Sequence, residues 1–311
     1  MAYLLPKKNL HNLVDSWSET YEVFVPQRRE KFSQFLPYSH ASEFIFENPH
    51  NTRFPPKAFF LPQSEVLFKF SRSGAVEPQD PEQKSSILLG VRPCDGRAIN
   101  LLDTNFETAE YIDPYWKNRR DRTLMIGLGC SNPSTSCFCT TVGSAPFGKQ
   151  GLDALLTEHG DDYVIEVITA RAQELFSSLP QADAEVLAQT QSFQEKVSAS
   201  MPVVFETEGL KETLDQNFEN PYWEQVSKSC LGCGVCTFLC PTCFCFDIAD
   251  EVRRSERVRN WDTCMFRTYS LEASGHNPRP SRKERTRQRL MHKYSYWVDH
   301  IAEIGCTGCG R

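Results

Sequence analysis

The segment SCLGCGVCTFLCP, residues 229–241, carries the most specific pattern in the chain. Its cysteines follow the spacing C-x2-C-x2-C-x3-C and are followed directly by proline: Cys230, Cys233, Cys236 and Cys240, then Pro241. Three closely spaced thiolates can take three corners of an iron–sulfur cubane, and the small Gly232 and Gly234 let backbone amides approach the sulfurs. A zinc site typically uses two C-x2-C pairs at longer separation, so zinc explains this spacing less well than an iron–sulfur cluster does. The segment therefore predicts a [4Fe–4S] cluster.

The same pattern begins again near the end of the printed sequence. The stretch IGCTGCGR, residues 304–311, repeats the first C-x2-C pair with Cys306 and Cys309. In two-cluster ferredoxins, the fourth cysteine of a run binds the other cluster. We therefore expect two cubanes in the complete module, one on Cys230, Cys233 and Cys236 and the other on Cys240, Cys306 and Cys309. The remaining ligand of each is expected beyond Arg311.

The composition limits the class of protein. A chain of 311 residues with 40% hydrophobic and 24% charged residues is close to the globular norm, which excludes global disorder. The net charge of -6 disfavours a generally basic surface for nucleic acid. The sequence opens without a signal-peptide core, and no stretch of about 18 apolar residues could span a bilayer. These features predict a cytoplasmic protein with no membrane span and no nucleic-acid partner.

The 13 cysteines fall in groups rather than scattering with a core. Four lie in residues 94–139, seven in residues 230–264, and two near the end, with none in residues 1–93 or 140–229. An odd number cannot pair completely within one chain, and grouped thiols in a chain of this length indicate metal ligation in a reducing compartment.

Two short apolar runs, residues 86–92 and 123–129, are typical of buried parallel strands, and the stretch between them includes a crossover helix around residues 96–105. Each run is followed by a cysteine, and two more lie in the loop after the second run. Because ligands gather at the carboxyl ends of parallel strands, these thiols are expected to converge on a further cluster. The group comprises Cys94, Cys130, Cys137 and Cys139. The alternative is small buried side chains with one reactive thiol.

The positions of the cysteine groups and the apolar runs predict an α/β or α+β body over residues 1–220 and a ferredoxin-like module over residues 221–311. Within the body, residues 163–169 are expected to form a strand. Surface helices are expected at residues 150–159, 171–177 and 182–190. In the module, three cysteines remain outside the ferredoxin pattern: Cys243, Cys245 and Cys264. We expect them to pack around the cluster; the alternatives are a substitute ligand and a redox-active thiol.

The residues between Cys240 and Cys306 form a long basic insert with one expected helix over residues 284–300. Its cations are Arg253, Arg254, Arg257, Arg259, Arg279, Arg282, Lys283, Arg285, Arg287, Arg289 and Lys293. A nucleic-acid surface is one interpretation. Because the whole chain is acidic, cations that offset anionic clusters and form a docking face for a partner subunit are the stronger prediction.

Several motifs together resemble a known family, the iron–sulfur beta subunits of cytoplasmic sulfhydrogenases, which are NAD(P)-linked [NiFe] hydrogenases. The sequence is equally similar to the A subunit of anaerobic sulfite reductases. The motifs that carry the resemblance are PPKAFFLP (55–62), GVRPCDGRA (90–98), residues 113–120, CSNPSTSCFC (130–139), LGCGVCTFLCPTCFCFDIADE (231–251), WDTCMF (261–266), ASGHNPRP (273–280) and RKERTRQRLMHKY (282–294).

The resemblance implies a non-catalytic subunit that passes electrons through [4Fe–4S] clusters. Its implied partners are a flavin- and NAD(P)-binding subunit and a catalytic metalloenzyme subunit. Two other functions are compatible with the residues. The chain could itself reduce a sulfur or disulfide substrate at the Cys94–Cys139 group or at Cys264, or it could be a redox-sensing regulator that binds DNA through the basic insert.

Overall fold

The computed structural model describes residues 1–44, 46, 51–71, 75–79 and 84–311. The chain divides into two compact units, each assembled from separated stretches. Unit 1 comprises Met1–Pro56, Gln83–Phe205 and Thr307–Arg311, and unit 2 comprises Lys57–Glu82 and Glu206–Cys306. The sequence predicts two continuous domains with a boundary near residue 220, and that division stays a prediction.

Unit 1 is built on a seven-stranded mixed sheet in the order β1-β9-β8-β7-β6-β2-β3. The strands are β1 (Ala2–Pro6), β2 (Glu22–Arg29), β3 (Phe32–Pro37), β6 (Ser86–Val91), β7 (Thr123–Leu128), β8 (Ala154–His159) and β9 (Asp162–Val167). The central strands β2, β6, β7 and β8 run parallel, whereas β1, β9 and β3 pair antiparallel at the two edges. The mixed α/β architecture expected for this part of the chain is confirmed.

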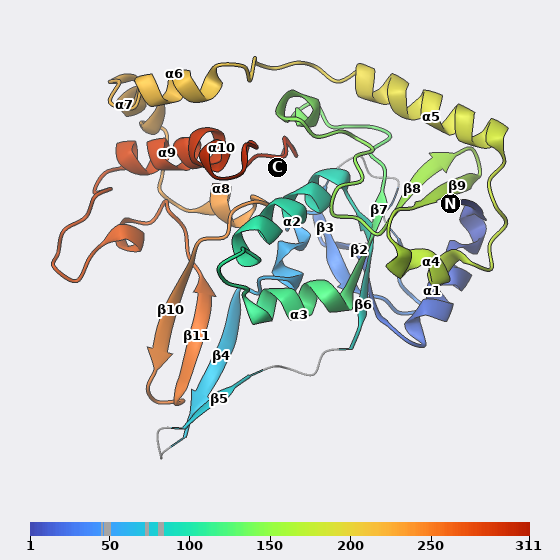
Figure 1. Cartoon of the computed structure of the whole chain (residues 1–311), viewed down its shortest axis with the longest axis horizontal. Coiled ribbons are helices and arrows are strands. Elements are labelled where there is room, and N and C mark those ends of the chain that lie inside the picture. The colour runs from blue at the N-terminus through green and yellow to red at the C-terminus, as the bar shows by residue number, and fades with distance from the viewer. Residues whose placement is uncertain (45, 47–50, 72–74, 80–83) are drawn as a thin grey trace. The chain divides into compact units, whose positions relative to one another are not determined.

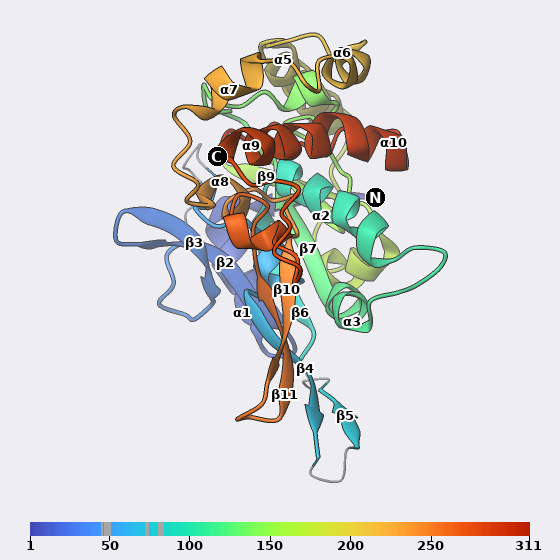
Figure 2. The same cartoon turned by 90° about the vertical axis from the view of Figure 1, so that its left-hand side faces the viewer.

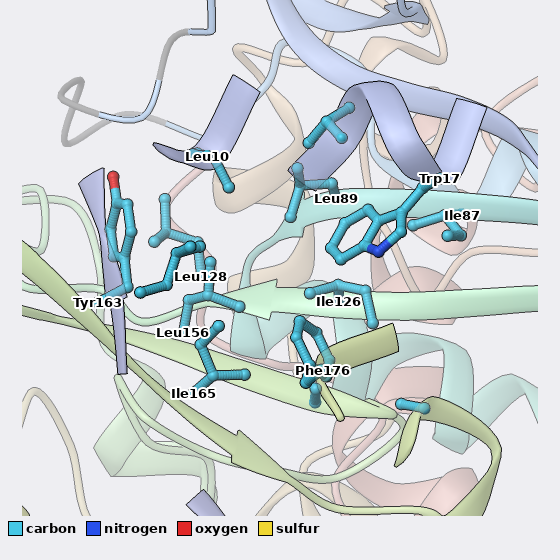
Figure 3. Close-up of a cluster of buried hydrophobic side chains, with 14 of the residues drawn as sticks. Leu10, Trp17, Ile87, Leu89, Ile126, Leu128, Leu156, Tyr163, Ile165 and Phe176 are labelled. Carbon is cyan, nitrogen blue, oxygen red and sulfur yellow. The ribbon is translucent and has the colours of Figure 1, made fainter. Parts of the chain in front are cut away.

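Helices α1 (Leu10–Ser18) and α4 (Gln173–Phe176) contribute to the buried core on one face of this sheet. Figure 3 shows Trp17 and Phe176 directed at the apolar side chains of the strands, among them Ile126. Side chains alternate along a strand, so Leu88 and Met125 serve the opposite face. Helices α2 (Pro93–Phe106) and α3 (Pro114–Arg122) pack against β7, and α5 (Ala184–Ala199) completes the unit.

The apolar runs at residues 86–92 and 123–129 form the adjacent parallel strands β6 and β7, as predicted, and the crossover helix between them is α2. The strand at 163–169 and the helices at 171–177 and 182–190 are likewise confirmed by β9, α4 and α5. The helix expected at residues 150–159 is wrong. Most of it is β8, because buried Leu155 and Leu156 sit between β7 and β9, and this pairing overrides local preference.

Unit 2 is built on a four-stranded antiparallel sheet in the order β10-β11-β4-β5 (Figures 1 and 2). The strands are β4 (Ser64–Phe70), β5 (Val76–Pro78), β10 (Phe246–Glu251) and β11 (Glu256–Trp261). A buried ion pair fastens the central strands, since Arg259 on β11 lies 2.6 Å from the Glu65 carboxylate on β4. The helices are α6 (Leu210–Gln216), α7 (Tyr222–Ser227), α8 (Val235–Phe238), α9 (Arg282–Met291) and α10 (Trp297–Ile301).

The basic insert is not helical throughout. It begins with the β10–β11 hairpin, and a helical stretch follows from α9 through a π-helical turn at His292–Tyr296 to α10. Several of its guanidinium groups donate within unit 2. Arg257 pairs with Asp250, Arg287 donates to the Phe218 carbonyl, and Arg289 donates to the Cys236 carbonyl. Because these arginines are already bonded to groups of the protein itself, the contacts weaken the nucleic-acid interpretation.

Replacement of the fully buried Ile126 by alanine is expected to lower the free energy of unfolding by about 2–5 kcal/mol, because it leaves a cavity between β7 and the helices. The matched control is Ile112→Ala in the same unit, where the side chain is 56% exposed and a change below about 0.5 kcal/mol is expected. Denaturant unfolding measures both. Equal losses in the two variants would contradict the assignment of the core.

Candidate metal centres

The loop from Cys230 to Cys240 in unit 2 has the backbone that a cluster-binding run needs. Gly232 and Gly234 both adopt left-handed conformations, with φ of 70° and 75°. The amide of Gly232 donates to the Cys230 Sγ at 3.4 Å. A Cβ on Gly234 would come within 2.9 Å of Thr263, so the turn into α8 requires glycine. The residues Cys233 and Cys236 are exposed, although burial raises the pKa of the Cys236 thiol.

Two buried lysines lie behind this loop. The Lys57 Nζ donates to the carbonyls of Thr237 and Cys243 at 3.2 and 2.7 Å and lies 4.4 Å from the centre of the Trp261 ring. The Lys293 Nζ donates to the carbonyl and hydroxyl oxygens of Thr242 at 2.9 and 2.7 Å. The lysines are only 2% and 3% exposed, and neither pairs with a carboxylate among the described residues.

The nearest groups that can carry negative charge are cysteine thiols. Burial lowers the pKa of Lys57 to about 8, against the opposing effect of the Cys243 and Cys240 thiols. Burial also acts to lower the pKa of Lys293, but the thiols of Cys240, Cys243 and Cys306 outweigh it and raise that pKa. A buried cation without a counter-charge is costly. Thiolates carrying an anionic iron–sulfur cluster supply that charge, so the residues present fit such a group.

The three cysteines outside the ferredoxin pattern lie in this same region of unit 2. The neighbouring Cys243 thiol lowers the pKa of Cys240, and the neighbouring Cys264 thiol lowers the pKa of Cys245 to about 6. Cys306 also belongs to unit 2, where its thiol interacts with Tyr294. Sequence reasoning found all of these cysteines but not Lys57, which lies far from them in the chain.

Unit 1 holds the cysteine group predicted at the strand ends. Cys94 lies in the first turn of α2, and Cys130 lies two residues after the end of β7. Cys137 lies in the loop beyond it, and Cys139 begins a short 3-10 helix. Electrostatic interactions link the thiol of Cys130 with those of Cys94, Cys137 and Cys139. Burial raises the pKa of three of these thiols, Cys94, Cys130 and Cys139. The pKa of Cys139 rises to about 11.

Cys309 lies in unit 1, next to this group. Its carbonyl accepts hydrogen bonds from the Asn51 amide at 2.6 Å and from the Cys137 thiol at 3.6 Å, and its thiol interacts with that of Cys94. The Phe138 amide donates to the Gly308 carbonyl at 3.0 Å, and a Cβ on Gly308 would come within 2.6 Å of the Cys139 backbone. The C-x2-C spacing of Cys306 and Cys309 does not predict that Cys309 lies beside Asn51, Cys94 and Cys137.

A buried ion pair holds the residues after Cys309 in place. Arg311 meets the Asp95 carboxylate through two hydrogen bonds of 2.7 Å, and both side chains are almost completely buried. Asp95 directly follows Cys94 in the first turn of α2, so the pair fixes the backbone beside that thiol. The carboxylate raises the pKa of Arg311 despite its burial, which keeps the guanidinium charged.

No three His, Cys, Asp or Glu side chains in the described ranges converge as a single metal ion would require. A cubane differs from a single ion because its four thiolates bind four separate irons and stand further apart. Among the described residues, no helix is both long and apolar enough to cross a membrane.

Comparison with known proteins agrees with this chemistry. Residues 229–311 match a family model described as a 4Fe-4S dicluster domain, which makes the chain an iron–sulfur protein. The whole chain is similar to sulfhydrogenase 2 subunit beta of Pyrococcus furiosus, with 32% identity over 94% of this chain and 91% of the relative. The chain belongs to the sulfhydrogenase beta-subunit family. No solved structure matches it. The family and the domain together support an iron–sulfur electron-transfer subunit.

Replacement of Asp95 by asparagine is expected to destabilise the protein by about 3–5 kcal/mol, because it leaves the Arg311 guanidinium buried without its counter-charge. The matched control is Asp121→Asn, which breaks the exposed pair between Lys117 and Asp121 and should cost less than about 1 kcal/mol. Denaturant titration at neutral pH compares them. Similar stability of the two variants would show that the Asp95 pair does not hold the segment.

Proposed function

We propose that this protein passes electrons through [4Fe–4S] clusters between a flavin- and NAD(P)H-handling subunit and a hydrogenase-like catalytic subunit. The observation that carries the proposal is the pair of buried lysines facing cysteine thiols with no carboxylate nearby among the described residues. A buried ammonium group is costly without an anionic partner, and the dicluster domain supports an iron–sulfur cluster as that partner.

The proposed ligands fall into two sets. The ferredoxin-type clusters use Cys230, Cys233, Cys236, Cys240, Cys306 and Cys309. A third cluster uses the strand-end cysteines Cys94, Cys130, Cys137 and Cys139. The electrostatic interactions among the strand-end thiols and their position at the carboxyl ends of β6 and β7 support the third cluster.

A bound cluster supplies one-electron redox chemistry, and the residues around it tune its reduction potential. Lys57 and Lys293 place positive charge behind the ligand thiols, which favours the more negative, reduced state. The Gly232 amide donates to the Cys230 sulfur and acts in the same direction. Cys233 and Cys236 are exposed residues, so a cluster on this loop would lie near the surface, where electrons can exchange with a partner over a short distance.

The partner subunits can be tested by purifying the tagged chain anaerobically from its native host. We expect a flavoprotein and a nickel-containing subunit to copurify with it. Recovery of a sirohaem subunit in place of nickel would assign the chain to a sulfite-reducing complex. Substrate turnover by the isolated chain with full iron content would contradict a purely electron-transferring role.

The variant Cys233→Ser is expected to lower the iron content by up to about 4 Fe per chain, because the exposed loop loses one of its ligands. Iron and acid-labile sulfide assays, with the EPR spectrum of the reduced protein, measure the loss. Ser229→Ala, next to the first ligand in the same loop, is the control and should keep its iron. Unchanged iron and spectrum in Cys233→Ser would exclude this loop as a cluster site.

A further inference from the structure

The loop at residues 230–240 of unit 2 presents apolar side chains to solvent beside exposed cysteines. Leu231 is 86% exposed and Val235 is 51% exposed. Cys233 and Cys236 are exposed residues as well. A single exposed leucine is ordinary on a protein surface, but these four residues lie within six positions and form one exposed stretch of the loop. We call these four residues the loop face.

Hydrogen bonds within unit 2 hold the backbone of the loop face in place. The guanidinium of Arg282 donates to the Cys230 carbonyl at 2.7 Å, and that of Arg289 donates to the Cys236 carbonyl at 3.0 Å. Both arginines belong to α9, so this helix fixes the loop on either side of the exposed apolar residues. Because the surface is already ordered, binding to it costs little conformational entropy.

Three exposed cations border the loop face: Lys228, Arg267 and Arg282. Lys228 caps the end of α7, just before the loop begins. Arg267 follows Phe266, whose ring lies 3.1 Å from the position that a Cβ on Gly234 would take. Arg282 bonds to the loop itself. The loop face therefore has positive charge on three neighbouring segments of the chain.

The wider surroundings of the loop face are also positive. The loop contains no Asp or Glu, and residues 262–293 hold eight Lys and Arg side chains against three carboxylates, although the whole chain has a net charge of -6. Two nearby carboxylates are already engaged. Glu219 lies 3.0 Å from the Arg287 guanidinium, and Glu284 accepts from the Ser281 amide at 2.9 Å. A partner with carboxylates on its binding face matches this charge.

A second copy of this chain does not suit the loop face. A two-fold interface uses the same surface of both copies. Lys228, Arg267 and Arg282 would then face their own counterparts, and like charges repel across an interface. The surface therefore fits a different protein with the opposite charge. Because the exposed cysteines belong to a proposed cluster site, a protein that carries electrons is the partner that fits best.

We propose that the loop face and its three bordering cations are the docking site for an acidic electron-carrier protein. The apolar side chains at the centre exclude water, and the cations at the rim orient the approaching partner and speed its association. In the docked pair, the reduced carrier loses one electron and the cluster on the loop gains it. The inference rests on the electron-transfer function proposed above and adds to it the contact surface and the charge of the partner.

The test measures electron transfer from a small, acidic, reduced ferredoxin to the oxidised full chain by stopped flow without oxygen. The double variant Lys228→Gln, Arg267→Gln removes two of the bordering cations and leaves Arg282, which holds the loop. We expect its second-order rate constant at low ionic strength to fall about 10-fold and to depend less on salt. Leu231→Ser should also slow the transfer but keep the salt dependence of the unchanged protein.

Three controls accompany this measurement. The double variant Arg253→Gln, Arg254→Gln removes two exposed cations at the turn between β10 and β11 and should change the ferredoxin rate less than about twofold. Iron content and reduction by photoreduced 5-deazariboflavin, a small uncharged reductant, should be the same in all variants. Electron transfer from the reduced chain to the basic protein cytochrome c should not slow when Lys228 and Arg267 are replaced.

Equal ferredoxin rates in the unchanged protein and in iron-replete variants of the loop face and its cations would overturn the docking site. An equal slowing with ferredoxin and with cytochrome c would overturn the preference for an acidic partner. A chain that holds no iron would instead contradict the electron-transfer function. The surface is then still tested by calorimetric binding of the oxidised ferredoxin, which should weaken about 10-fold in the double variant Lys228→Gln, Arg267→Gln.

Discussion

The buried positive charge next to the cysteines is the constraint on which unit 2 depends. Lys57 and Lys293 donate to backbone carbonyls and a hydroxyl, but hydrogen bonds to neutral oxygens do not cancel a charge inside a protein. Thiolates on iron–sulfur clusters do, and they gain in return, because nearby cations and amide donors make reduction of an anionic cluster easier. Charge balance and redox tuning are therefore two effects of the same residues.

Each unit supplies a rigid frame for its thiols. In unit 1, parallel β6 and β7 end at Val91 and Leu128, and the ion pair of Arg311 with Asp95 fixes the segment that carries Cys309 beside Cys94. In unit 2, the β10–β11 hairpin is fastened to β4 through Arg259 and Glu65. Thiols held at strand ends and hairpin bases move little, and a small reorganisation favours fast electron transfer.

Much of this could be predicted from the sequence where the signal is local. The apolar runs of β6 and β7 and the spacing after Cys230 depend on neighbouring residues alone. The strand β8 was missed because its conformation comes from pairing with β7 and β9. Lys57 was missed for a related reason: it contacts Cys243 across 186 positions, and no local pattern marks a lysine as buried. The position of Cys309 beside Cys94 likewise depends on the tertiary fold.

The most direct test of the charge-balance account is the reduction potential of the unit 2 clusters in Lys293→Met, followed by EPR-monitored titration. Methionine fills a similar volume without the charge, so the account predicts a potential more negative than that of the unchanged protein, with the same iron content. The exposed Lys228→Met is the control and should leave the potential where it was. An unchanged potential in an iron-replete Lys293→Met protein would contradict the account.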